Sequence, residues 1–221
     1  MKILIESAAL DVIRWALDSR LADGVFVTPA ALDEDAFGVA PLAQVESITR
    51  LSSAPVIVVV GAIAADDLHQ NGRELARASD TVAVAVPFVD DGIVALQRLA
   101  VEGVRTAATF VVTPAQALLA AKVGATQVCV AVEELDAHGH DPSLTLRDIR
   151  KIFDRHGIEC EVVAVTTHSP RLVTAAFVAG ADSVVVSAPT LRALMQHPLT
   201  DRALDRLLGE VSRHHRPRPD E

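Results

Sequence analysis

Eight short runs of mostly β-branched residues, separated by segments with helical periodicity, constrain the fold of this chain more than any other feature. A run that is apolar at nearly every position is typical of a strand buried on both faces, as in a parallel sheet covered by helices. Eight such units in a chain of 221 residues predict a compact (β/α)8 TIM barrel. The runs are residues 2–5, 24–28, 55–60, 81–86, 105–112, 126–132, 160–165 and 182–187.

A doubly wound open sheet is the alternative fold. Such a sheet normally carries a Gly-rich phosphate loop after its first strand, and the segment IESAAL at residues 5–10 contains no glycine. No linker or low-complexity stretch interrupts the chain. Residues 1–221 are therefore predicted to form one domain, which ends in a helix at about 190–213 and a short disordered tail.

Composition narrows the possible partners and the location of the protein. A net charge of −9 argues against a nucleic-acid surface. No apolar run reaches the roughly 18–20 residues needed to span a bilayer, and the first ten residues predict a strand and not a signal peptide. Cys129 and Cys160 fall on separate predicted strands, which indicates unpaired thiols and a cytoplasmic protein.

Side-chain alternation predicts which residues face the interior of the barrel. In the run at 81–86, Ala83 and Ala85 share one face and the valines share the other. We expect the valines to pack under helices and the alanines to point inward. Active sites of such barrels lie at the C-terminal ends of the strands, so small inward residues leave space for a ligand there.

Five stretches of the chain are similar to one known family. They are QALLAAKVGAT (116–126), LDAHGHD (135–141), AVTTHSPRLV (164–173), AGADSVVVS (179–187) and QHPLTDRALDRLL (196–208). Through them the chain resembles the small transaldolase and fructose-6-phosphate aldolase family over almost its whole length. The resemblance implies a single barrel whose C-terminal helix clasps a neighbouring subunit. A homo-oligomer, either a pentamer or a decamer, is the assembly we expect.

The resemblance also implies which positions would carry the family's chemistry, and most of them are changed. The Schiff-base lysine falls on Ala85, whose methyl group cannot be a nucleophile. An arginine of the phosphate site falls on Glu134, which would repel a phosphate. A threonine is retained as Thr109. The other aligned positions hold Glu6 for an aspartate, Thr28 for an asparagine, Val59 for an acid or amide, Ala131 for an aromatic residue, and Thr166, Thr167 and His168 for a Ser-x-Arg motif.

No second lysine is placed to replace the missing amine. The chain has only Lys2, Lys122 and Lys151, and none of them is predicted at the barrel mouth. Tyrosine is absent, so no phenol can act as an acid there. The sequence therefore predicts that Schiff-base aldol chemistry on a sugar phosphate has been lost.

Glu6 is the one ionisable group predicted in the inner layer of the mouth. A carboxyl in an apolar pocket has a raised pKa, which suits a general acid or base. Thr109 and Thr166 could hold a carbonyl or hydroxyl group beside it, and no cofactor is expected. The alternative is that Glu6 only forms hydrogen bonds with neighbouring threonines. The remaining predicted binding residues are Thr28, Val59, Ala85, Ala131, Glu134, Thr167 and His168.

A second group of polar residues falls on the loops after the sixth and seventh strands. The candidate metal ligands are His138, His140, Asp141 and His168, with Glu133 and Glu134, and their side chains are of the types that bind zinc. The competing interpretation is that these loop residues are solvated or cap helices, and Asp141 is expected to cap a helix that begins at Pro142. Our prediction is that no metal is bound.

The acidic rim of the predicted mouth favours a neutral or cationic small molecule. Asp66, Asp67, Asp90 and Asp91 begin two helices, where carboxylates are ordinary dipole partners and also face the mouth. Three functions follow. The first is an enzyme that uses Glu6 for proton transfer on an unphosphorylated substrate, of isomerase, lyase or cyclase type. The second is a non-catalytic ligand-binding or scaffolding oligomer. The third is residual transaldolase or aldolase activity.

Overall fold

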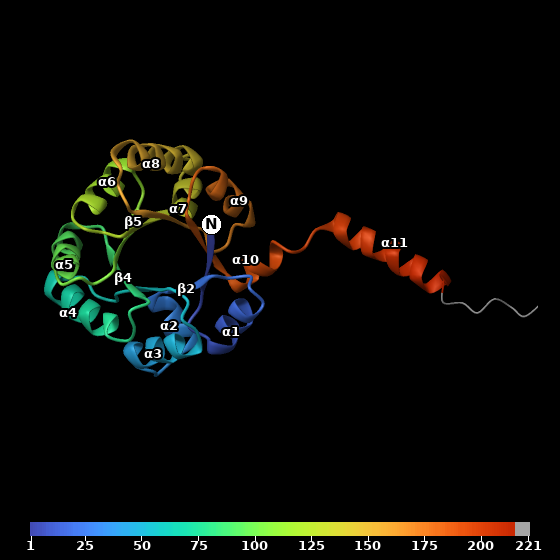
Figure 1. The fold of residues 1–221 in the computed structure, drawn as a ribbon, viewed down its shortest axis with the longest axis horizontal. Helices are drawn as coiled ribbons and strands as arrows, with labels where there is room; N and C mark the ends of the chain where they lie inside the picture. Colours follow the sequence, from blue (N-terminus) through green and yellow to red (C-terminus); the bar gives the residue numbers. More distant parts are fainter. Residues whose placement is uncertain (215–221) are drawn as a thin grey trace, which may run out of the picture.

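The computed structural model describes residues 1–214, and it confirms the predicted (β/α)8 barrel. All neighbouring strands are parallel, they follow one another in chain order, and the eighth pairs with the first (Figure 1). The predicted disordered tail lies almost entirely beyond residue 214, outside the described range. The strands are β1 (Lys2–Glu6), β2 (Gly24–Val27), β3 (Val56–Val59), β4 (Val82–Pro87), β5 (Thr106–Val111), β6 (Gln127–Ala131), β7 (Glu161–Val165) and β8 (Ser183–Ser187).

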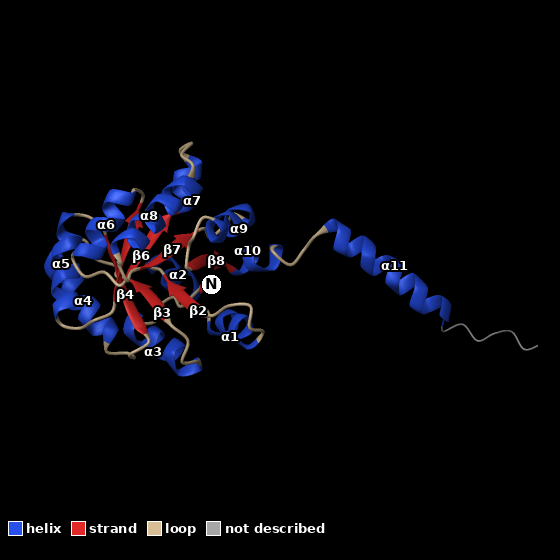
Figure 2. Ribbon diagram, turned by 45° about the horizontal axis from the view of Figure 1, so that its top comes forward, coloured by secondary structure: helices blue, strands red, loops and turns tan. Residues whose placement is uncertain are grey.

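Helices surround the strands and bury their outer face (Figure 2). Several helices begin with proline, whose missing N–H would have no partner in the first turn. Asp141 caps α8 as predicted, because its Oδ1 accepts a hydrogen bond from Ser143 N at 2.9 Å. The helices are α1 (Leu10–Asp18), α2 (Pro29–Asp35), α3 (Pro41–Leu51), α4 (Ala65–Ala76), α5 (Asp90–Val101), α6 (Pro114–Lys122), α7 (Val132–Ala137), α8 (Pro142–His156), α9 (Pro170–Val178), α10 (Ala188–Ala193) and α11 (Pro198–His214).

The barrel has two apolar cores, one inside the strands and one between strands and helices. On β4, Ala83 and Ala85 belong to the inner core, whereas Val82, Val84 and Val86 belong to the outer one. The predicted orientation of this strand is therefore confirmed. The inner core consists of Leu4, Phe26, Ile57, Val59, Ala83, Ala85, Ala107, Cys129, Val163 and Val185.

A polar network closes the end of the barrel where the strands begin. Lys2 Nζ donates to Glu161 Oε1 at 2.7 Å, and Gln127 Nε2 donates to Glu161 Oε2 at 2.8 Å. Lys2 lies on the same inward row of β1 as Leu4 and Glu6. This network places the first of the three lysines at the opposite end of the barrel from the C-terminal ends of the strands.

The C-terminal segment differs from the single helix expected at about 190–213. Pro198 cannot continue a helix, so the segment splits into α10 and α11, and His197 Nδ1 accepts a hydrogen bond from Leu199 N at the start of α11. Figure 1 shows α11 extending away from the barrel. Every side chain described from residue 192 to residue 211 is exposed. Among the described helices, none is both long and apolar enough to cross a bilayer.

Replacing Gly92 with alanine should destabilise the barrel. Gly92 lies in the first turn of α5, where an added Cβ would overlap the carbonyl oxygen of Pro87 at the end of β4. Because backbone atoms must move to relieve the overlap, we expect a loss of about 1–3 kcal/mol in the free energy of unfolding, measured by urea denaturation. Gly61→Ala is the control, since its Cβ would meet only the side chain of Pro29, at ordinary distances of 3.5 Å from Cγ and 3.8 Å from Cβ. Equal stability of the two variants would contradict this packing.

Candidate functional site

A cavity of about 360 Å³ opens at the C-terminal end of the barrel, where such folds carry their active sites. Its floor is apolar, and three carboxylates stand on its walls. A second hollow of about 340 Å³ adjoins it and shares Glu6, Thr28 and Ala30 with it, so Glu6 lies between the two. The cavity is lined by Glu6, Phe26, Thr28, Pro29, Ala30, Val59, Thr109, Phe110, Cys129, Ala131, Glu133, Glu134, Val165 and Thr167.

The backbone around Glu6 is held by residues of α2. Asp35 Oδ2 accepts hydrogen bonds from Ser7 Oγ and Ala8 N, both at 2.8 Å, directly after β1. Thr28 caps the same helix, because its Oγ1 accepts from Ala31 N at 3.1 Å. The hydroxyl hydrogen of Thr28 is then left to donate to Glu6 Oε1, at 3.2 Å. The Thr28 cap at the start of α2 and the Asp35 carboxylate at its end thus hold Glu6 and the backbone that follows it.

Burial raises the pKa of Glu6 above its ordinary value of 4.5. The hydrogen bond from Thr28 and the proximity of His168 act in the opposite direction and lower the pKa, while Glu133 and Glu34 raise it further. The net effect is that the Glu6 carboxyl is protonated to a greater extent in the folded protein than in water at the same pH. The shift therefore has the direction expected for a carboxyl that exchanges protons near neutral pH.

A bulge in β5 directs Thr109 and Phe110 into the cavity. Ala108 pairs with Val128 and Val111 pairs with Val130, so the residues between them on β5 outnumber those on β6. Phe110 takes a φ of 62°, which is unusual for a residue with a side chain and is typical of functional sites. No residue within 1–214 forms a hydrogen bond with the Thr109 hydroxyl, which therefore remains available to a ligand.

Of the two threonines in the loop after β7, only Thr167 lines the cavity, whereas Thr166 is the one expected beside Glu6. Thr166 is fully buried, and its Oγ1 lies 3.2 Å from the carbonyl oxygen of Ser169, not beside Glu6. Thr167 does line the cavity, while His168 lines the adjoining hollow. All three residues converge on the Glu133 carboxylate, whose nearest partner is the backbone N–H of His168 at 2.6 Å.

The other predicted binding residues are divided between the cavity and the inner core. Val59, Ala131 and Glu134 line the cavity. Ala85 is fully buried in the inner core, beside Val59 and Ala107 in the sheet register, and does not line the cavity. Position 85 therefore contributes a methyl group beneath the cavity floor and no polar atom.

The candidate metal ligands do not converge. Within the part of the chain that the structure describes, no group of three His, Cys, Asp or Glu side chains is arranged to hold a metal ion. His138 Nδ1 contacts the carbonyl oxygen of Glu134 at 2.7 Å, at the end of α7, while His168 packs against Glu133. His140 is exposed at the start of α8.

Both cysteines are buried and unpaired, as expected. Cys129 lies in the cavity floor, where burial raises the pKa of its thiol to about 12. Burial also raises the pKa of Cys160 to about 12. A thiol with such a pKa carries almost no thiolate at neutral pH, so Cys129 is not a nucleophile.

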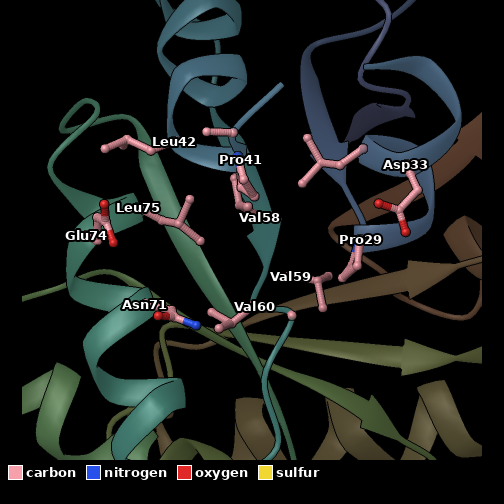
Figure 3. A pocket seen from close by; sticks show the side chains of 13 residues that line it. Pro29, Asp33, Pro41, Leu42, Val58, Val59, Val60, Asn71, Glu74 and Leu75 are labelled. Atoms are coloured by element: carbon pink, nitrogen blue, oxygen red, sulfur yellow. The ribbon is translucent and has the colours of Figure 1, made fainter. Parts of the chain in front are cut away.

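A separate cavity of about 430 Å³ lies outside the barrel, between α2, α3 and α4. Figure 3 shows Asp33 and Glu74 on opposite sides of it, with Val59 and Pro29 at the base. Val59 and Pro29 also line the mouth cavity, so the two spaces share one wall. No pattern in the sequence indicates this space, because it depends on how α2 and α3 pack after β2.

Seven residues that line the cavity are not among the predicted site residues: Phe26, Pro29, Ala30, Phe110, Cys129, Glu133 and Val165. Of these, Phe26 and Val165 follow from alternation along β2 and β7. The sequence suggests Glu133 only as a metal ligand, because its contacts depend on a loop more than thirty residues away. Phe110 lines the cavity because of a bulge that no pattern in the sequence marks.

The fold and the site together define a class of protein: a TIM barrel with a small cavity, apolar at its floor and acidic on its walls, at the C-terminal ends of its strands. The model of the family "Transaldolase/Fructose-6-phosphate aldolase" matches residues 40–216, and the chain belongs to this family. A "Probable transaldolase" of Thermodesulfovibrio yellowstonii is 32% identical over 95% of this chain and 97% of its own length. Proteins with the same name from Thermoplasma volcanium and Caulobacter sp. K31 are 33% and 35% identical, over 95% of this chain and 95% and 96% of their own lengths.

Changing Glu6 to glutamine should stabilise the fold at pH 8 and leave it unchanged near pH 4. Because the folded pKa of Glu6 is raised, the wild type loses stability as pH rises from 4.5 through the folded pKa, and the neutral amide does not. The carboxylate keeps part of its hydration, so we expect a gain of only a few degrees in Tm, measured by calorimetry across this pH range.

Glu161→Gln is the matched control, because its pKa shift has the opposite sign. Burial would raise the pKa of Glu161, but hydrogen bonds from Lys2 and Gln127 outweigh it and lower the pKa. The wild type therefore gains stability from Glu161 above pH 4.5 and loses it as pH falls through the folded pKa. Glu161→Gln should lower Tm at pH 8. A Glu6→Gln variant that also lost stability at pH 8 would contradict the raised pKa.

Proposed function

We propose that this protein is an enzyme that uses Glu6 to transfer protons on a small unphosphorylated substrate, without forming a Schiff base. The observation that carries the proposal is the position of Glu6 between two hollows at the mouth, with a raised pKa and with an unbonded Thr109 hydroxyl on the opposite wall of the same cavity. The reaction class is proton transfer next to a carbonyl group, which underlies isomerase, lyase and cyclase reactions.

The charges around the mouth support an unphosphorylated substrate that is neutral or cationic. Among the described residues that line the cavity, Glu6, Glu133 and Glu134 are acidic and none is a lysine or arginine. A phosphate would meet like charges here, and no guanidinium would bind its oxygens. The resemblance places the family's Schiff-base lysine at Ala85, where no amine is present.

The geometry supports a division of roles between Glu6 and Thr109. As its pKa is raised, an ionised Glu6 is a stronger base than an ordinary carboxylate, and it can remove a proton from the carbon next to a carbonyl. The bond between carbon and hydrogen breaks, the proton moves to a Glu6 oxygen, and negative charge develops on the carbonyl oxygen. The Thr109 hydroxyl would donate to that oxygen. Return of the proton to a different carbon completes an isomerisation.

Exchange of hydrogen for deuterium tests this role without knowledge of the natural substrate. Dihydroxyacetone is incubated with the protein in D₂O, and loss of its carbon-bound protons is followed by NMR. The wild type should catalyse the exchange, and Glu6→Gln should slow it by roughly 10²–10⁴-fold, as expected for loss of a general base. Glu46→Gln is the control, because it makes the same chemical change on α3, where Glu46 is paired with Arg50 and lines neither hollow. Equal rates for the wild type and Glu6→Gln would refute the role of Glu6.

Two other outcomes would support the competing functions. No exchange by the wild type, with dihydroxyacetone or with other unphosphorylated ketones, would favour a non-catalytic binding or scaffolding protein. Treatment with borohydride and fructose 6-phosphate distinguishes residual aldolase activity. We expect no covalent adduct by mass spectrometry, because Lys2 lies at the far end of the barrel and Lys122 and Lys151 lie on α6 and α8.

We also propose that the protein is a homo-oligomer in which α11 binds a neighbouring copy. Leu204, Leu208 and Val211 are spaced along one face of α11, and all are exposed. A contact between the helix of one copy and the body of the next is heterologous, and it closes into a ring such as a pentamer, or a decamer of two rings. Buried unpaired cysteines are compatible with the cytoplasm as the location of this assembly.

The groove between α6 and α8 is the surface that best fits α11. Its volume is about 580 Å³, its lining is mostly aliphatic, and Lys122 and His156 border it. Asp201 and Asp205 lie beside the apolar face of α11, where they could pair with these groups, while Arg206 lies on the opposite face. Charge and apolar character therefore complement each other across the proposed contact.

Replacing Leu204 and Leu208 together with aspartate should dissociate the oligomer. Charges on the apolar face of α11 would have to be buried without partners in the contact. Light scattering after size exclusion should show a monomer for the double variant and a larger species for the wild type, while circular dichroism stays that of a folded barrel. Arg206→Ala should leave the mass unchanged. A wild type that is monomeric at micromolar concentrations would contradict the proposal.

A further inference from the structure

The Glu133 carboxylate is bound by the loop after β7 as an anion would be. His168 N donates to Oε1 at 2.6 Å, and Thr167 Oγ1 donates to Oε2 at 3.2 Å. Thr166 Oγ1 lies 3.4 Å from Oε1 and 3.2 Å from the carbonyl oxygen of Ser169. His168 Nδ1 lies 3.4 Å from Oε2 and 2.7 Å from Thr167 Oγ1. These four groups, which we call the β7 cradle, come from three consecutive residues and surround one carboxylate. The cradle is thus an arrangement of donors that is already filled by the chain itself.

The topology explains why Glu133 can reach the cradle. β6 and β7 are neighbours, and Ala131 pairs with Val165 at their C-terminal ends. Glu133 follows β6 in the first turn of α7, so its side chain lies beside the residues that follow β7. Only 28% of the Glu133 side chain is exposed, compared with 71% for that of Glu134. One of the two adjacent carboxylates is therefore held in the wall of the cavity, while the other extends into solvent.

We propose that Glu133 determines substrate specificity by occupying the β7 cradle and so excluding anionic groups from the mouth. The cradle consists of a backbone N–H, two hydroxyls and an imidazole, which together suit a phosphate or carboxylate group of a ligand. With Glu133 in place, the hydrogen-bond donors of the cradle are already occupied. The negative charge of Glu133 at the same position would also repel an anionic ligand. This inference rests on the proposed function, in which the substrate is neutral or cationic. It adds that Glu133 is the residue that excludes anionic substrates.

The position of Glu133 also separates its role from that of Glu6. Both carboxylates line the cavity, but Glu6 is bound by Thr28 on β2–α2, and Glu133 by the loop after β7. Glu133 has donors on both of its oxygens. It is therefore placed to reject or select the charged group of a substrate, while Glu6 is placed to exchange protons.

Binding of inorganic phosphate to Glu133→Ala tests the proposal without turnover. Truncation to alanine should vacate the cradle, and the variant should bind phosphate at least roughly tenfold more tightly than the wild type, measured by calorimetric titration. Glu133→Gln separates occupancy from charge. Its amide oxygen can still accept the hydrogen bond from His168, so its affinity for phosphate should stay close to that of the wild type.

Glu134→Ala is the comparison, since it removes the same charge one residue away and leaves Glu133 in the cradle. Because Glu134 also borders the cavity, its loss should raise the affinity for phosphate, but clearly less than the loss of Glu133. Equal gains in affinity for Glu134→Ala and Glu133→Ala would show that only overall charge matters, and would overturn the proposal. No gain in a folded Glu133→Ala would overturn it as well. Loss of activity in Glu6→Gln bears only on the proposed function, because phosphate binding requires no catalysis.

A second variant and a second measurement cover the case in which Glu133→Ala is unstable. Glu133→Ser also empties the cradle but keeps a polar group that can hydrate the nearby donors. Phosphate that binds only the folded state raises Tm by mass action. Tm of Glu133→Ala and Glu133→Ser should therefore rise with phosphate concentration more than Tm of the wild type or of Glu134→Ala. Equal responses of all four proteins would contradict an occupied cradle.

Discussion

Closure of eight short parallel strands is the constraint from which the rest of this structure follows. Once the barrel is closed, every second side chain of each strand must fit inside it. Here several of the inward residues are small, among them Ala83, Ala85 and Ala107. Larger residues such as Phe26 and Ile57 fill the middle of the barrel. Nearer the C-terminal ends of the strands, Val59 and Ala131 line the cavity beside Glu6 and leave it unfilled.

A single inward row of β1 illustrates how polarity is distributed along the barrel. Lys2, Leu4 and Glu6 follow one another on the same face of the strand. Lys2 is paired with Glu161 at one end, Leu4 is buried in the inner core, and Glu6 has only a threonine as partner at the other. The end with a paired charge contributes to stability, whereas the end with a poorly compensated carboxyl costs stability and is available for chemistry.

The fold could be predicted from the sequence because it depends on repeating local patterns. The runs of β-branched residues located all eight strands, and alternation placed Ala85 inside and Val84 outside. The site could be predicted only in part. Glu6 and Thr109 follow from position on a strand, but the orientation of the Thr166 hydroxyl depends on the turn after β7, where Ser169 competes for it.

Contacts between separate loops explain most of what the sequence could not show. Glu133 acquires its partners only when the ends of β6 and β7 are brought together, and the positive φ of Phe110 depends on an extra residue between two paired strands. The break before α11 was predictable in principle, since Pro198 marks it. The capping role of Thr28 could also have been recognised from the proline that follows it.

The two buried thiols have a practical consequence. Cys129 and Cys160 are both inaccessible, and burial raises the pKa of each to about 12. Reagents that require a thiolate will therefore leave the folded protein unmodified. A single cysteine introduced on the surface, for example on α11 or on the loop beside Phe110, would become the one reactive position in the described chain. Spectroscopic probes could then be attached site-specifically without first removing the native cysteines.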